Sequence, residues 1–328
     1  MDITVGNINN ESLQVFLESN EQKSTFLLNV LDGLTLTHNK NCAPSVLKCT
    51  ILSDSRIKIN EGDAVLLKEH GNNIFKGYIT DIFQNEKGQM NIIAYDQLFY
   101  FKYKDTYFYE NKSAGDILKK WASYFGLKTE NIASGYRVPR RDEWNKPIRD
   151  MLKYAIEETY IQTGVLLVLF DKCGYINLLP SSSLTVNDYV IDVANAGGYT
   201  YSSSIASNTY NRVKLAYKNS ENGVLEHFVA SDKDKEQLYG ILQYYAEIPG
   251  KDAAQQSAEQ ILKKTRIAHK YYSVKGVLSA NNAHIYGGYS VFVRLFSDDT
   301  KVYRLMVDTV THRWTKGNHL MDINFIAI

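Results

Sequence analysis

The first third of the chain alternates apolar and polar residues in short segments. Sequences rich in Gly, Asn and Asp separate these segments, and such residues tolerate the positive φ angles that tight turns need. Short alternating strands at this spacing predict an antiparallel sandwich or a small barrel. The alternating segments are residues 34–36, 47–51, 57–59, 65–67, 75–82 and 90–93. We therefore assign residues 1–104 to a first small antiparallel β-barrel domain.

The next part of the chain changes to helical periodicity. It begins with an aromatic-rich stretch at residues 94–113, after which Ser113 and Asp116 resemble a helix capping box. Apolar residues at helical spacing continue to Gly126, where this first helix is expected to end. A second helix is predicted from near Pro147, because the fixed φ angle of proline suits the first helical position.

A hairpin is predicted after this second helix. Its strands are residues 165–170 and 175–179, with the turn at 171–174. Before the second helix, the charged residues 136–144 favour a solvated loop over an anion site. The Ser- and Gly-rich residues 180–200 have linker composition, with one possible short strand at 189–193. We assign residues 105–200 to an α+β middle domain.

The last third returns to alternation, with one helical interruption. A helix capped by Ser231 or Asp232 is predicted through Tyr245, and a second from Asp252 through Leu262, which together would form a helical hairpin. Strands are expected before and after it, at residues 213–217, 224–230, 274–278, 291–295, 303–307, 310–314 and 320–325. We therefore predict a discontinuous second small antiparallel β-barrel (201–230 and 271–328) interrupted by a helical-hairpin insertion (231–270), and an α+β fold class overall.

Composition limits the classes of function. The 328 residues are 44% hydrophobic, which is enough for two or three cores, and the formal net charge is only +1. This near-neutral balance does not indicate nucleic-acid binding, so we expect no specific nucleic-acid recognition. We also expect no membrane anchor, because no stretch is long and apolar enough for a membrane span. Three cysteines without close spacing indicate synthesis in a reducing compartment, and the 24 tyrosines favour sheet faces and subunit interfaces.

The residues that could carry chemistry form no recognised motif. The sequence has no Walker loop, HExxH, GxSxG or GxGxxG. His312 and His319 could face each other across a turn, and local hydrogen bonding is favoured over a metal pair because no third ligand is evident. Residues 232–236 resemble the start of a calcium loop but favour an acidic first helical turn.

Cys173 lies in a predicted turn, without the helix N-terminus or cation that would activate a thiol. No pair of carboxylates is singled out for glycoside cleavage. We assign no catalytic, cofactor-binding or metal-ligating residue and no cofactor, and predict that the protein is not an enzyme.

Several sequence motifs resemble one known family along nearly the whole chain, in order. The motifs are the stretch AYDQLFYFKYKDTYFYENKSAGDIL (94–118), Asn145-Lys146-Pro147, Phe170-Asp171-Lys172-Cys173-Gly174-Tyr175-Ile176, Tyr210-Asn211-Arg212-Val213-Lys214, Leu238-Tyr239-Gly240-Ile241-Leu242-Gln243, Thr311-His312-Arg313-Trp314 and Gly317-Asn318-His319-Leu320-Met321. In these motifs the chain resembles the XkdQ/YqbQ proteins of PBSX-like phage tails and R-type bacteriocins.

The resemblance implies a structural role. Members of this family form the baseplate hub of a contractile tail, where a homotrimer with two related barrels per copy joins the hexameric tail tube protein to the trimeric central spike protein. Contacts with other baseplate components are implied as well. Such a protein would reside in the bacterial cytoplasm during assembly and then in the extracellular phage tail or tailocin particle. The alternative hypothesis is a tail-associated peptidoglycan hydrolase, because some relatives are labelled hydrolases.

Overall fold

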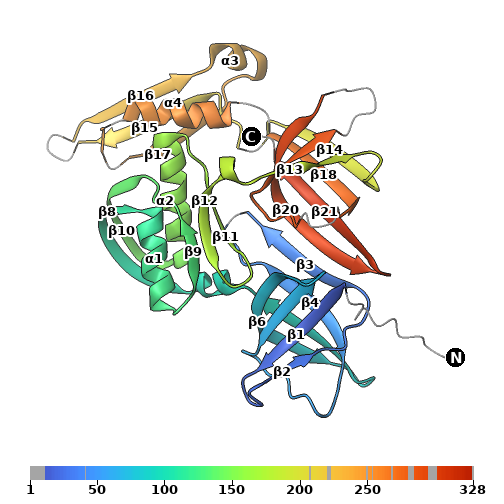
Figure 1. Ribbon diagram of the computed structural model, residues 1–328. Coiled ribbons are helices and arrows are strands. Elements are labelled where there is room, and N and C mark those ends of the chain that lie inside the picture. Colours follow the sequence, from blue (N-terminus) through green and yellow to red (C-terminus); the bar gives the residue numbers. More distant parts are fainter. Residues whose placement is uncertain are drawn as a thin grey trace.

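The computed structural model describes residues 12–40, 42–206, 208–219, 223–248, 250–252, 254–266, 269–279, 284–294 and 301–326. Within these ranges the chain is predominantly β-sheet with few helices, and it forms two β modules, an α+β middle unit and a small inserted unit (Figure 1). The N-terminal residues 1–11 of the predicted first barrel and residue 295, the last of a strand predicted for the second barrel, lie outside the described residues.

The first β module is built from strands whose buried faces follow the alternation in the sequence. In β1, for example, Leu13, Val15 and Leu17 point into the core while the residues between them are half-buried. The strands pair antiparallel in the order β3-β4-β7-β6-β5-β1-β2. They are β1 (Leu13–Ser19), β2 (Ser24–Leu27), β3 (Leu34–Asn39), β4 (Val46–Leu52), β5 (Ala64–Glu69), β6 (Asn72–Gln84) and β7 (Gln89–Tyr95).

The middle unit packs two helices against a two-stranded ribbon and a three-stranded sheet. Its elements are η1 (Gln97–Lys102), β8 (Lys104–Ser113), α1 (Ala114–Tyr124), β9 (Thr129–Ile132), β10 (Arg137–Pro147), α2 (Ile148–Thr163), β11 (Leu167–Asp171), β12 (Ile176–Pro180) and η2 (Ser181–Ser183). Ser113 and Asp116 form the predicted capping box, and Gly164 ends α2 in the left-handed conformation. The predicted hairpin is confirmed as β11 and β12.

Two predictions for this region are wrong. Residues 136–144 do not form a loop, because most of them belong to β10, which pairs antiparallel with β8 along nearly its whole length. Only Val138 and Glu143 of β10 are buried, and they are five positions apart, so the strand has no alternating pattern that the sequence could show. The expected linker at 180–200 contains the whole of β13 (Thr185–Asp192), which includes most of the short strand expected at 189–193, and the start of a second strand, β14 (Gly198–Ser204).

The second β module shares one sheet with the first, where we had predicted two separate barrels. Strand β20 is long enough to pair with β19 through residues 303–306 and with β3 through residues 309–314, while β21 lies along its other edge. The result is one 13-stranded sheet, and no sheet is closed within the described part of the chain. The strands of the second module are β13, β14, β18 (His269–Leu278), β19 (Ser290–Arg294), β20 (Tyr303–Thr315) and β21 (Asn318–Ile326).

The inserted unit is a small α/β layer rather than the predicted helical hairpin. Its elements are β15 (Arg212–Lys218), β16 (Leu225–Ser231), α3 (Lys233–Tyr239), β17 (Gln243–Glu247) and α4 (Ala254–Thr265). Asp232 caps α3 as predicted, but Gly240 at φ 75° ends this helix. The chain then forms β17, parallel to β15. Strands β15 and β16 pair in this sheet and not with the second β module, which corrects the predicted second barrel (201–230 and 271–328).

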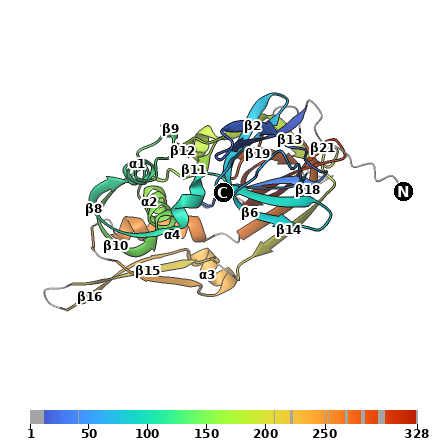
Figure 2. The ribbon, with the colours of Figure 1, turned by 90° about the horizontal axis from the view of Figure 1, so that it is seen from below.

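The second predicted helix of the insertion is confirmed as α4. Its buried residues Ala254, Ala258 and Leu262 recur at helical spacing and face the sheet of β15 and β16. Figure 2 shows α4 between this sheet and α2, so the helix joins the inserted unit to the middle unit.

Candidate functional site

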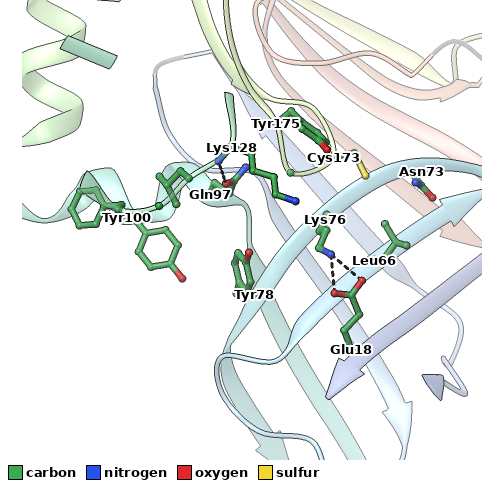
Figure 3. A pocket seen from close by; sticks show the side chains of 14 residues that line it. Glu18, Leu66, Asn73, Lys76, Tyr78, Gln97, Tyr100, Lys128, Cys173 and Tyr175 are labelled. Carbon is green, nitrogen blue, oxygen red and sulfur yellow. Dashed lines mark hydrogen bonds and ion pairs between the residues drawn. The ribbon is translucent and has the colours of Figure 1, made fainter. Parts of the chain in front are cut away.

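A cleft of about 590 Å³ lies between the first β module and the middle unit. Strands β1, β5 and β6 form one wall, and η1, the segment after α1 and the β11–β12 turn form the other (Figure 3). Clefts between packed units are common ligand sites, so its lining is a first place to look for catalytic groups. The lining residues are Glu18, Leu66, Asn73, Lys76, Tyr78, Gln97, Tyr100, Phe125, Gly126, Leu127, Lys128, Cys173, Gly174 and Tyr175.

The carboxylate in this cleft is paired with one lysine, and a second lysine lies over an aromatic ring. Lys76 Nζ lies 2.8 and 2.9 Å from the two carboxylate oxygens of Glu18 (Figure 3). Lys128 Nζ lies 5.7 Å from the ring centroid of Tyr175. Among the described lining residues Glu18 is the one carboxylate. Glycosidases of the common kind need two carboxylates flanking the bond, so this lining does not match their chemistry.

Cys173 lies at the cleft in the β11–β12 turn, as predicted. Burial, with the nearby Asp171 carboxylate, raises the pKa of its thiol to about 11, and Lys76 opposes this shift only in part. The thiol is therefore protonated at neutral pH, whereas nucleophilic cysteines are thiolates. We conclude that Cys173 in this position is not an activated nucleophile.

Two buried carboxylates lie behind the cleft, and sequence reasoning missed both. Asp171 accepts hydrogen bonds from Gln97 Nε2 (2.8 Å) and from the Gly174 amide (2.6 Å). Asp96 accepts from the amides of Ser45 (2.8 Å) and Leu98 (2.9 Å). Burial raises the pKa of Asp171 to about 6 and that of Asp96 well above its ordinary value. Asp96 at the start of an aromatic helical turn was a usable capping signal, but nothing in the sequence indicates its proximity to Asp171.

Four histidines gather where the two β modules meet. His312 Nδ1 lies 2.8 Å from His319 Nε2, which confirms the predicted local contact across the β20–β21 turn. His38 of β3 and His284, which precedes β19, were not singled out in the sequence. Their Nε2 atoms lie 2.9 Å apart, and the rings of His284 and His312 stack with centroids 4.2 Å apart.

The three rings of His38, His284 and His312 do not have the geometry of a metal centre. A metal ion lies in the plane of each imidazole that binds it, but the planes of His284 and His312 are nearly parallel, at 9°. Two nitrogens on a tetrahedral zinc lie about 3.3 Å apart, farther than the 2.9 Å between His38 and His284. Both nitrogens of His312 already have hydrogen-bond partners. We interpret the set as a hydrogen-bonded network.

The same network contains a Ser–His contact that is not a catalytic pair. Ser45 Oγ lies 2.8 Å from His38 Nδ1, a distance found between a nucleophile and its base. Both side chains are buried, and His38 Nε2 faces His284 instead of an orienting carboxylate. Asp96 accepts a hydrogen bond from the Ser45 amide and therefore does not orient the imidazole of His38. A catalytic triad needs an exposed hydroxyl and an oriented base, so this contact has a structural role.

Comparison with known proteins assigns the chain to a family. The model of the YQBQ-like family matches residues 34–326. The chain belongs to the YQBQ-like family. The protein YqbQ of Bacillus subtilis (strain 168) is 27% identical over 309 residues, with 90% of this chain and 92% of YqbQ covered. The phage-like element PBSX protein XkdQ of the same organism is 28% identical over 313 residues, with the same coverage.

Solved structures show the same fold. A 43 kDa tail protein of prophage MuSo2 from Shewanella oneidensis has a TM-score of 0.70 at 12% identity, over 95% of this chain and 98% of that protein. A component of the E. coli type VI secretion system, itself structurally similar to tail proteins of bacteriophage T4, has a TM-score of 0.55 at 10% identity, over 96% and 76%. The relatives and structural neighbours of this YQBQ-like chain thus include phage tail and tail-related structural proteins.

The structure gives positions to the motifs that carry the family resemblance. The segment 311–314 and the segment 317–321 form the two sides of the β20–β21 turn, against the first β module. Residues 170–176 form the hairpin turn at the cleft. Among the described residues no helix is long and apolar enough to cross a membrane.

Proposed function

We propose that this YQBQ-like protein is a structural component of a phage-type tail baseplate, in which three copies form the hub between the tail tube and the central spike. The observation that carries the proposal is the extent of the fold likeness. A tail protein matches 95% of the chain, so the likeness includes both β modules, the middle unit and the inserted unit. A likeness confined to one module would support a shared building block only.

The two β modules suit such an adapter. They are fixed relative to each other by the six residue pairs between β3 and β20, so one chain presents two β modules as one body. Three copies related by a threefold axis would present six such modules to a sixfold tube and keep threefold symmetry for a spike. In this proposal the protein assembles in the bacterial cytoplasm and then belongs to the extracellular tail particle.

The chemistry of the cleft supports a role without catalysis over the alternative of a peptidoglycan hydrolase. Its carboxylate, Glu18, is paired with Lys76, and its thiol, Cys173, is protonated. A hydrolase would need a free general acid or an activated nucleophile at this position.

Assembly is the direct test of the adapter. The purified chain, alone and coexpressed with the tube and spike proteins of its own gene cluster, would be measured by light scattering. We expect a trimer that binds both partners, with a mass of three chains plus a spike trimer. A chain that stays monomeric in every combination would contradict the proposal.

A separate assay tests the alternative. Purified protein would be incubated with peptidoglycan, with the Cys173→Ser and Glu18→Gln variants in parallel. We expect no release of soluble fragments from any sample. Fragments that depend on either side chain would favour the hydrolase.

A further inference from the structure

A chain of four polar groups crosses the joint between the two β modules. Glu69, at the end of β5 in the first module, lies 2.8 Å through Oε1 from Nδ1 of His319 in β21. His319 Nε2 lies 2.8 Å from His312 Nδ1 in β20, and His312 Nε2 lies 2.8 Å from the carbonyl oxygen of Ile285. Trp314 Nε1 donates a second hydrogen bond to Glu69 Oε1, at 2.7 Å. These side chains are buried or nearly so.

Counting the hydrogens along this chain fixes its protonation. A carbonyl oxygen only accepts, so His312 Nε2 must carry the hydrogen that bonds Ile285. Burial lowers the pKa of His312 to about 3, so this ring is neutral and its Nδ1 is an acceptor. His319 Nε2 must therefore donate to His312. One more hydrogen is then needed between His319 Nδ1 and Glu69, because two bare acceptors would repel at 2.8 Å.

That last hydrogen belongs to His319 rather than to Glu69. Burial alone would raise the pKa of Glu69, but the hydrogen bonds from His319 and Trp314 outweigh it, and the net shift is downward. The ring of Trp314 also stacks on His319 with centroids 4.3 Å apart, an arrangement that stabilises a cation. We propose that Glu69 and His319 form a carboxylate–imidazolium pair, so that one bound proton at neutral pH locks the β20–β21 turn of the second β module onto β5 of the first.

Among the described residues, the surrounding groups do not supply an alternative partner for this proton. From β3, His38 faces His284 and Ser45. From the segment before β19, the rings of His284 and Tyr286 pack on the network, and burial keeps both neutral. From β20, Arg313 bonds Asp322 of β21 and is not part of this chain of contacts. From β5, Lys68 lies over the ring of Phe16.

The pair makes the joint sensitive to acid. Glu69 has a lowered folded-state pKa, so its contribution is present above the ordinary value of 4.5 and is lost as the pH falls through the folded value. The β3–β20 ladder does not depend on Glu69, so the expected change on acidification is a local separation of β5 from the β20–β21 turn.

Nitrogen NMR reads the proposed state directly. The full chain, labelled with ¹⁵N-histidine, would be recorded in a long-range ¹H–¹⁵N correlation at pH 7, and His319 assigned by the loss of its signals in His319→Gln. We expect both ring nitrogens of His319 to show the shifts of protonated imidazolium nitrogens. One protonated and one bare nitrogen on His319 in the unmodified protein would overturn the proposal.

Two variants and a metal assay complete the test. Glu69→Gln should convert His319 to the neutral form, whereas Glu18→Gln, which removes an ion-paired carboxylate from the same module, should leave it cationic. The spectrum of the unmodified protein decides the question even if Glu69→Gln does not fold. Metal analysis of the same sample is expected to find no zinc, and stoichiometric zinc bound to the histidines would overturn the proton assignment.

Discussion

The Cα atom of Gly288 faces the side chain of Val168 with no space for a methyl group between them. Gly288 precedes β19 in the second β module and has φ +86°, while Val168 lies in β11 of the middle unit. The neighbouring Gly287 packs equally closely on the backbone of Asn39 and Lys40, at the end of β3. Three units of the chain therefore meet at two glycines, and their close contact depends on the absence of a side chain at Gly287 and at Gly288.

Substitution of Gly288 by alanine should destabilise the protein through two separable effects. Positive φ disfavours alanine by about 1–2 kcal/mol, and the overlap with Val168 should add about 1–3 kcal/mol. Gly62→Ala is the matched control, because Gly62 has φ +88° and open space around its Cα. Urea unfolding would measure both variants. Equal losses in the two would show that the Val168 contact carries no energy.

As the pH falls, buried histidines and buried aspartates should change the unfolding free energy in opposite directions. Burial lowers the pKa of His312 to about 3. Between that value and 6.5 the unfolded chain binds a proton there that the folded chain does not, so acidification removes stability. Asp171 has its pKa raised to about 6 from 3.8, so in that interval the folded chain binds the extra proton and acidification adds stability.

Two variants separate these dependences. His312→Gln should make the loss of unfolding free energy on acidification shallower, and Asp171→Asn should make it steeper, by up to about 1.4 kcal/mol per pH unit for each group. The slope of the unfolding free energy is compared with the unmodified protein from pH 6.5 to about pH 4. A slope that changes in the same direction in both variants would contradict the assigned protonation states.

The side chain of Asn211 should be essential for the turn at Gly240, where α3 ends and the predicted helix does not continue. It is fully buried, donates through Nδ2 to the carbonyl oxygens of Lys235 (3.1 Å) and Gly240 (2.7 Å), and accepts from the Leu242 amide (2.8 Å). Asn211→Ala leaves these three backbone groups without that partner and should lower stability by about 2–4 kcal/mol. In this variant the rate of hydrogen exchange at the backbone amides of residues 233–247 should rise.

An exposed asparagine provides the comparison. Asn85 makes a similar set of turn contacts, accepting from the amides of Lys87 and Gln89, but water can replace them. Asn85→Ala should therefore lower stability by less than about 1 kcal/mol. If both alanine variants unfolded alike, burial of the Asn211 contacts would not be the reason for their strength.

Local sequence signals predicted the local structure well. The Ser113 capping box and the β11–β12 hairpin each depend on residues within a few positions of one another. The residues 238–245 show the limit of periodicity, because their apolar spacing fits a helix while Gly240 and two tyrosines favour a turn and a strand. There the pairing with β15, a tertiary contact, decides the structure.

The site shows the same division between near and distant contacts. His312 and His319 are seven residues apart across one turn, and their contact was predictable. His38 and His284 are 246 residues apart, and they meet only because β3 pairs with β20. No local pattern encodes that pairing, since each strand alone fits its own module. For the same reason the single 13-stranded sheet could not be inferred from two sets of alternating segments.

The buried hydroxyl of Tyr109 should destabilise the folded protein. It is buried in the core of the middle unit near Glu143, and it has no hydrogen-bond partner among the described residues. A buried polar group without a partner costs about 1–3 kcal/mol, so Tyr109→Phe should raise the unfolding free energy by about 1 kcal/mol. Tyr189 is the matched control, because its hydroxyl donates to the Leu278 carbonyl oxygen and Tyr189→Phe should lower stability by about the same amount. Thermal unfolding of both variants would compare them directly. A loss of stability in Tyr109→Phe would mean that the hydroxyl is satisfied in solution, with an ordered water as the natural partner in that position.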